Sequence, residues 1–129
     1  MTVMALDVGD RRTGIAVSDP DEQLARPLRT IERAGSSEGI ASICQMVDEL
    51  NVSTVVVGLP LRLDGTRGPQ ADRAASLADR LQARLDVPVV LHDERFTSTL
   101  ADRLHGDGGH DRDSRAAAHL LSSWMEART

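Results

Sequence analysis

Aromatic side chains are almost absent from this chain, which has one Phe, one Trp and no Tyr among its 129 residues. A nucleic-acid surface that stacks successive bases on a platform of rings is therefore disfavoured. There is also only one cysteine, Cys44, which excludes an internal disulfide, and no Cys/His spacing indicates a zinc site. Cys44 follows the apolar spacing of a predicted helix, so we expect a small core residue rather than a catalytic thiol.

Long apolar runs and a basic-apolar leader segment are missing as well, which predicts a cytoplasmic protein that does not contact a membrane. All fifteen cationic residues are Arg, none is Lys, and the net charge is −5. The negative sum argues at first sight against a nucleic-acid partner, but binding depends on where charge lies rather than on its total. Arg binds phosphate with paired hydrogen bonds, so the lack of Lys does not oppose such a role.

Alternating and helical patterns of apolar residues predict one α/β domain over residues 1–129, in the order β-β-β-α-β-α-β-α-α. A hairpin over 3–18 and an edge strand over 25–31, with Pro27, precede a helix capped by Ser36 or Ser37. The remaining predicted elements are strands at 55–57 and 87–91 and helices at 71–85, 99–104 and 114–127. Strands joined through helices imply a parallel part, so we expect a mixed five-stranded sheet flanked by helices.

Asp7 is a carboxylate inside the first apolar run, where a core strand favours Val or Leu. A buried charge requires a cation or hydrogen-bond donors, so Asp7 is a candidate site residue. We expect Gly9 and Gly14 to leave room for a phosphate or a metal ion beside it. The alternative is that Asp7 ends the strand and caps the turn, although Asp10 is better placed for that.

Two further carboxylates complete a candidate site. Glu94, within His92-Asp93-Glu94-Arg95, follows a buried strand at the end where open α/β sheets place their sites. Asp113 precedes a predicted helix, and its alternative role is a helix N-cap. If Asp7, Glu94 and Asp113 converge, their hard oxygen atoms suit two divalent cations, Mg²⁺ or Mn²⁺.

These segments together resemble the YqgF/RuvX family of nucleases. The resemblance covers essentially the whole chain. It is carried by Ala5-Leu6-Asp7-Val8-Gly9, Thr13-Gly14-Ile15-Ala16-Val17-Ser18-Asp19, Ala25-Arg26-Pro27-Leu28, Val57-Gly58-Leu59-Pro60-Leu61 with Asp64-Gly65-Thr66, His92-Asp93-Glu94-Arg95 and Asp113-Ser114. It implies a ribonuclease H-like fold, with Asp7, Glu94 and Asp113 as catalytic residues and metal ligands. It further implies metal-assisted phosphodiester hydrolysis, at the 5′ end of precursor 16S ribosomal RNA or on Holliday junction DNA.

Several candidates and departures accompany this resemblance. Family members often carry lysines before the final Asp-Ser, whereas this chain has Gly and Asp residues there, with Asp111 as a possible additional ligand. The candidates for phosphate contacts are Arg11, Arg12, Arg62, Arg67 and Arg95. His92 and His119 are expected to be structural, and His110 to be a loop residue.

The sequence also leaves two rival functions open. A non-catalytic nucleic-acid-binding module of the same fold would not need three acidic positions. A sugar-kinase or actin-like ATPase, which also begins with an Asp-x-Gly hairpin, needs two lobes, and this chain has length for one. No apolar helix face is left over for a partner, so we expect a monomer or a weak homodimer.

Overall fold

Five strands form one mixed sheet in the computed structural model, which describes residues 1–94 and 112–128. The elements are β1 (Thr2–Val8), β2 (Arg12–Ser18), β3 (Ala25–Glu32), α1 (Ser37–Glu49), β4 (Val52–Leu59), α2 (Pro69–Gln82), β5 (Val89–Asp93) and α4 (Arg112–Ala127). Their order along the chain confirms the predicted one, and the helix predicted at 99–104 lies outside the described residues.

The strand order across the sheet is β3-β2-β1-β4-β5. β1 pairs antiparallel with β2, and β2 with β3, so β3 is an edge strand as its Pro27 predicts. β1 pairs parallel with β4, and β4 with β5. The carboxyl ends of these three parallel strands therefore meet at one edge of the sheet, where Asp7 and Glu94 are located.

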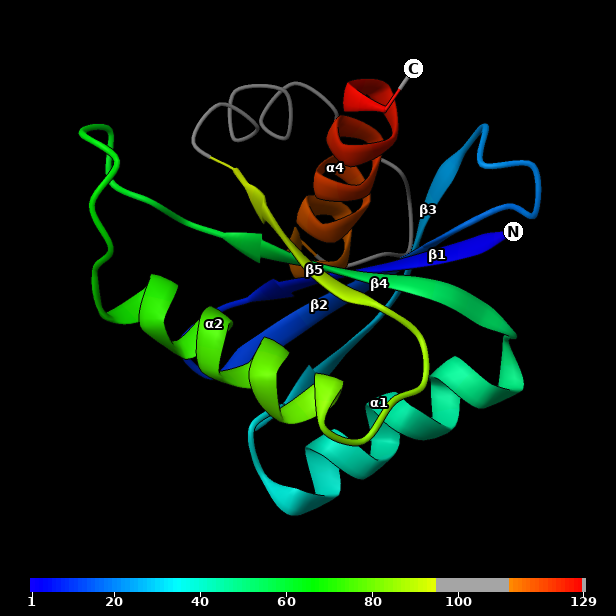
Figure 1. The fold of residues 1–129 in the computed structure, drawn as a ribbon, viewed down its shortest axis with the longest axis horizontal. Coiled ribbons are helices and arrows are strands. Elements are labelled where there is room, and N and C mark those ends of the chain that lie inside the picture. The colour runs from blue at the N-terminus through cyan, green and yellow to red at the C-terminus, as the bar shows by residue number, and fades with distance from the viewer. Residues whose placement is uncertain (95–111, 129) are drawn as a thin grey trace.

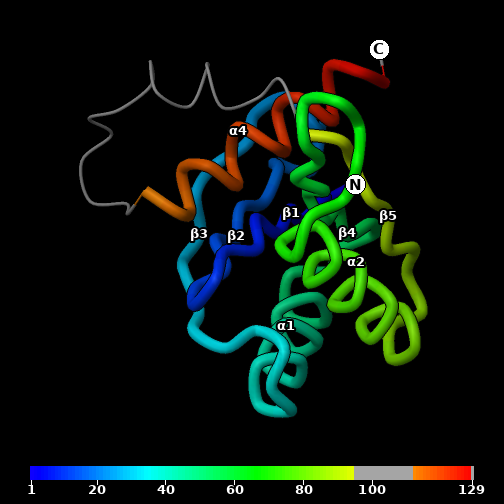
Figure 2. The backbone as a smooth tube through the Cα atoms, turned by 90° about the vertical axis from the view of Figure 1, so that its left-hand side faces the viewer, coloured from blue at the N-terminus to red at the C-terminus, as the bar shows by residue number. Residues whose placement is uncertain are grey.

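Helices cover both faces of the sheet, with α4 on one face and α1 and α2 on the other (Figure 1 and Figure 2). Side chains alternate along β1, so Val3 and Ala5 pack in the core under α4 while Met4 and Leu6 pack in the core over α1 and α2. The run 55–57 in β4 is fully buried, which confirms a strand covered on both faces.

Local chemistry explains where the helices on the second face begin. Ser36 is the N-cap of α1, as predicted, and its Oγ accepts a hydrogen bond from the N–H of Gly39 at 3.0 Å. α2 begins with Pro69, which has no N–H to leave unsatisfied in the first turn.

Three predicted boundaries are wrong. β5 begins at Val89 rather than Val87, because Gln82 binds the carbonyl of Val87 and the N–H of Val89 in place of a neighbouring strand. It then continues to Asp93, so His92 and Asp93 lie in the strand and not in the loop after it. α4 begins at Arg112, which places Asp113 in the first turn of the helix instead of at its N-cap.

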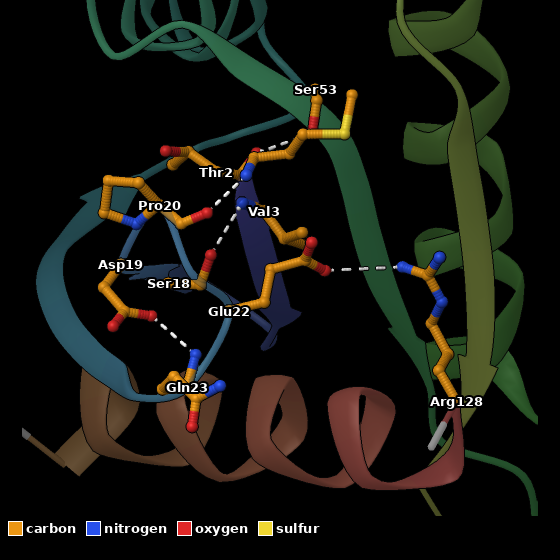
Figure 3. Close-up of polar contacts among 10 residues, drawn as sticks. Thr2, Val3, Ser18, Asp19, Pro20, Glu22, Gln23, Ser53 and Arg128 are labelled. Carbon is orange, nitrogen blue, oxygen red and sulfur yellow. Dashed lines mark hydrogen bonds and ion pairs between the residues drawn. The ribbon is translucent and has the colours of Figure 1, made fainter.

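The amino end of β1 is fastened on both sides (Figure 3). The N–H of Val3 donates to the Oγ of Ser18 at 2.8 Å in a buried contact, and the Ser53 hydroxyl donates to the carbonyl of Thr2 at 3.1 Å. Glu22 pairs with Arg128 after the end of α4, at 3.5 Å. The contacts of Thr2 and Val3 hold β1 in place, and with it Asp7 near its other end.

None of the helices in the described residues combines the length and the apolar character that crossing a bilayer requires.

Candidate active site

Asp7 is the last but one residue of β1 and pairs with Gly14 of β2. It shares the strand face of Val3 and Ala5, so its side chain lies on the α4 side of the sheet. Burial, with a further contribution from the nearby charge of Asp113, raises the pKa of the Asp7 carboxyl to about 6. Because β1 continues through Val8, Asp7 does not end the strand.

Glu94 comes directly after β5, and its N–H donates to the carbonyl of Leu59 at the end of β4, at 3.3 Å. Its carboxylate lies over Gly58, since a Cβ at that glycine would be 2.2 Å from Glu94 Oε2 and 2.9 Å from Leu120 Cδ2. Burial, followed by the charges of Asp7 and Asp93, raises the pKa of the Glu94 carboxyl to about 8. Gly58 thus makes the space in which this carboxylate is buried.

Asp113 approaches the same place from the first turn of α4. A Cβ at Gly14 would be 1.9 Å from the Asp113 carbonyl oxygen, so only a glycine in β2 allows the helix backbone to pack this closely. The Oδ2 of Asp113 faces the Nε of Arg12 at 3.6 Å, and both side chains remain partly exposed.

The expected role of the two glycines beside Asp7 is therefore wrong. Gly14 accommodates protein backbone rather than a ligand. Gly9 closes the hairpin turn, because its N–H donates to the Arg12 carbonyl at 2.8 Å and a Cβ there would be 2.7 Å from that oxygen. The glycine that gives space to a carboxylate of the candidate site is instead Gly58, near the end of β4. Its position beside the β-branched run of β4 is the feature of the sequence that could have indicated this role.

Electrostatic coupling connects the three acidic residues. The charge of Asp113 acts on Asp7, and the charge of Asp7 acts on Glu94. Within residues 1–94 and 112–128, no three acidic, His or Cys side chains already lie close enough to coordinate one ion. The donor set nevertheless fits a divalent cation, because a positive charge would offset both the burial of these carboxylates and their mutual repulsion.

The other sequence candidates have different surroundings. Arg11 lines a pocket at the turn between β1 and β2. Arg62 donates to the Thr66 hydroxyl and to the carbonyl of Arg67, each at 3.4 Å, within the exposed loop after β4. Arg95, His110 and Asp111 lie outside the described residues.

His92 has a structural contact, as expected. Its Nε2 lies 3.1 Å from the Ser123 hydroxyl, which connects β5 to α4. Burial lowers the pKa of the His92 ring, and the opposing charge of Asp93 is the smaller influence. His119 lies on α4 and is partly buried.

A family model described as "RuvX: Holliday junction resolvase" matches residues 1–127. This chain belongs to the RuvX family. A protein of Chloroflexus aurantiacus named "Putative pre-16S rRNA nuclease" is 42% identical over 133 residues, covering 98% of this chain and 87% of that protein. A protein of the same name from Anaeromyxobacter dehalogenans is 42% identical over 135 residues, covering 99% of this chain and 98% of the relative. The expected family is thereby confirmed.

Solved structures confirm the expected ribonuclease H-like fold of this RuvX-family chain. T. thermophilus RuvC in complex with a Holliday junction substrate has a TM-score of 0.64 at 14% identity, with 99% of this chain and 96% of that chain covered. The fowlpox virus Holliday junction resolvase has a TM-score of 0.60 at 11% identity, with both chains covered completely.

Proposed function

We propose that this RuvX-family protein is a metal-dependent nuclease that hydrolyses phosphodiester bonds and processes the 5′ end of pre-16S ribosomal RNA. The observation that supports this most is the meeting of Asp7 and Glu94 at one edge of the parallel strands, with Asp113 on the first turn of α4 beside them. The RNA substrate rests on the names of the two relatives described above.

Asp7, Glu94 and Asp113 are the residues that would hold Mg²⁺ or Mn²⁺. When bound, two such ions activate water and stabilise the leaving oxygen of a phosphodiester. Burial raises the pKa of the Glu94 carboxyl to about 8, so this group would have to give up a proton to serve as a metal ligand. Arg12 contacts Asp113 and orients its carboxylate. Arg11, together with Arg62, Arg67 and Arg95, binds the phosphates of the substrate.

Branched DNA is the second candidate substrate. It is favoured by the description of the matching family and by the RuvC neighbour, whose structure holds a Holliday junction. Symmetric cleavage of a junction requires a twofold dimer, whereas trimming an RNA end does not. The predicted monomer or weak homodimer thus agrees better with the RNA substrate, and sedimentation at micromolar concentration tests it.

A side-by-side cleavage assay decides between the candidates. The protein is incubated with an RNA that carries the 5′ precursor segment of 16S rRNA and with a four-way DNA junction, each with Mg²⁺, with Mn²⁺ and with chelator. We expect metal-dependent cleavage of the RNA at a defined position and little cleavage of the junction. Paired symmetric cuts in the junction with an intact RNA would favour the resolvase instead. Tight binding of both substrates without cleavage in either metal would indicate the non-catalytic module.

A further inference from the structure

Four arginines surround a pocket on the side of the sheet that faces away from the carboxylates. The pocket holds about 230 Å³ and is formed by the turn between β1 and β2, the loop before α1 and one side of α2. We call it the arginine pocket and define it by Arg11, Arg33, Arg73 and Arg80; Asp10 is the one acidic residue among the described residues that line it. In Figure 1 this turn lies beside α2, at the same end of β1 as Asp7.

The four guanidinium groups are not all neutralised by the residues that the structure describes. Arg73 pairs with Asp10 at 2.5 Å, and Arg80 donates to the carbonyl of Gly35. Within the described part of the chain, Arg11 and Arg33 have no acidic or hydrogen-bonding partner for their side chains. A pocket with this excess of positive charge, in a chain whose net charge is −5, attracts an anion.

The backbone holds the two unpartnered arginines together. The N–H of Arg33 donates to the carbonyl of Arg11 at 3.1 Å. Arg33 itself has φ 53, a left-handed conformation that is unfavourable for a residue with a Cβ. Its carbonyl accepts from both the N–H and the hydroxyl of Ser36, at 2.9 and 2.7 Å, and these bonds fix that conformation. The structure thus places both free guanidinium groups at one pocket before any ligand arrives.

A second hollow continues from the arginine pocket toward the carboxylates. It is lined by Asp10, Arg11, Arg12, Glu32 and Arg33, so Asp10, Arg11 and Arg33 belong to both. Arg12, at the far side of this second hollow, contacts Asp113. A line of arginines therefore leads from the carboxylate site around the β1–β2 turn to the opposite face of the sheet.

The size and chemistry of the pocket suit a phosphate group. One water needs roughly 10–15 Å³ of cavity, so this pocket admits a group of several heavy atoms. Arg side chains bind phosphate oxygens with paired, charge-assisted hydrogen bonds. Among the described residues, no aromatic ring that could hold a base lines the pocket, which favours recognition of the backbone alone.

We propose that the arginine pocket binds a backbone phosphate of the nucleic-acid strand that leaves the carboxylate site, so that the strand bends around the β1–β2 turn. This inference rests on the proposed nuclease function, since it assigns a second contact of the same substrate. The contact is to phosphate and not to sugar or base, so RNA and DNA strands are held equally.

The test compares Arg33→Gln and Arg33→Glu with Arg84→Gln. Arg33 has no side-chain partner to lose among the described residues, so its replacement leaves the fold intact, which a melting curve verifies. Arg84 is an exposed arginine just after α2 and outside the pocket. Its replacement by Gln removes the same charge as Arg33→Gln and therefore serves as the control. Affinity for fluorescent single-stranded RNA and DNA of one sequence is measured in chelator over a range of salt concentrations.

We expect Arg33→Gln to weaken binding of both strands roughly three- to tenfold at low salt. The slope of log affinity against log salt should fall by about 0.7, since one phosphate contact is lost, and Arg33→Glu should weaken binding further. Arg84→Gln should behave as the parent. Equal slopes for the Arg33 and Arg84 variants would overturn the proposal, as would a loss confined to RNA.

Cleavage by the parent protein separates this inference from the proposed function. A reduced slope in the Arg33 variants together with no cleavage by the parent in Mg²⁺ or Mn²⁺ would support the pocket and contradict the nuclease. Cleavage by the parent, together with a parental salt dependence of binding in the Arg33 variants, would support the nuclease and contradict the pocket.

Discussion

Replacing Asp7 with Asn removes one charge from the carboxylate site while almost preserving the shape of the side chain. In the folded protein without metal, burial and the charge of Asp113 raise the Asp7 pKa from 3.8 to about 6. Each tenfold change in proton affinity corresponds to about 1.4 kcal/mol, so the ionised carboxylate costs the folded state at most about 3 kcal/mol. Asp7→Asn removes that cost.

The Asn variant does not recover all of this free energy of folding, because a buried amide also requires hydrogen-bond partners. We therefore expect the variant to be about 1 kcal/mol more stable than the parent without metal, or roughly 3–5 °C higher in Tm for a chain of this length. The assay is a thermal melt of both proteins in chelator. Asp79→Asn, on the exposed side of α2, serves as the matched control and should leave Tm unchanged.

The pH dependence of Tm tests independently whether the ionised Asp7 carboxylate destabilises the folded protein. A carboxyl whose pKa is raised by folding imposes no cost below its unfolded value of 3.8, where it is protonated in both states. The cost grows between 3.8 and about 6 and is constant above that range. The Tm advantage of Asp7→Asn should thus be absent near pH 4 and complete at pH 7.5.

Mg²⁺ should reverse the order of stability. A ligand present at a hundred times its Kd stabilises the native state by about 2.7 kcal/mol, and the variant, which lacks one of the proposed metal ligands, should gain much less. A structural Asp7 bonded to backbone donors would produce the opposite pattern. In that case the variant would melt below the parent in chelator and respond to Mg²⁺ as the parent does, and the reasoning would be refuted.

Three further predictions concern other parts of the molecule. Gly58→Ala should displace the Glu94 carboxylate and the Leu120 side chain, and so lower kcat strongly while costing about 1–3 kcal/mol of stability; a variant with parental kcat would contradict the placement of Glu94 over Gly58. Ser18→Ala should cost about 1–2 kcal/mol because it leaves the buried N–H of Val3 without an acceptor, and chemical denaturation at constant m-value measures this. Arg11→Ala and Arg95→Ala should weaken substrate binding and its salt dependence while nearly preserving Tm, and an unchanged salt slope in both would identify them as ordinary surface charges.

Local patterns predicted much of the fold. The β-branched run of β4, the hairpin at the start and the helical spacing around Ile43 depend on near neighbours, and each element was found where expected. Pro27 correctly indicated an edge strand because its missing N–H is a property of the residue itself.

The details of the site depend on contacts between distant parts of the chain, and these were not predictable. The space at Gly14 is filled by the backbone of residue 113, and the space at Gly58 by the side chain of residue 94. In a sequence, a glycine beside a carboxylate has the same pattern whether it admits a ligand or a helix. The arginine pocket is not predictable for a similar reason, since Arg33 comes from the loop before α1 and Arg80 from α2, and only the fold brings them to one pocket.

The most direct measurement is cleavage of the RNA substrate by the parent protein and by Asp7→Asn, Glu94→Gln and Asp113→Asn, in chelator and after Mg²⁺ or Mn²⁺ is restored. If these carboxylates hold the metal ions, the parent is inactive in chelator and recovers with either metal, while each variant remains folded and loses activity by orders of magnitude. Full cleavage in excess chelator, or parental activity in the Asp7 and Glu94 variants, would contradict this role of the carboxylates.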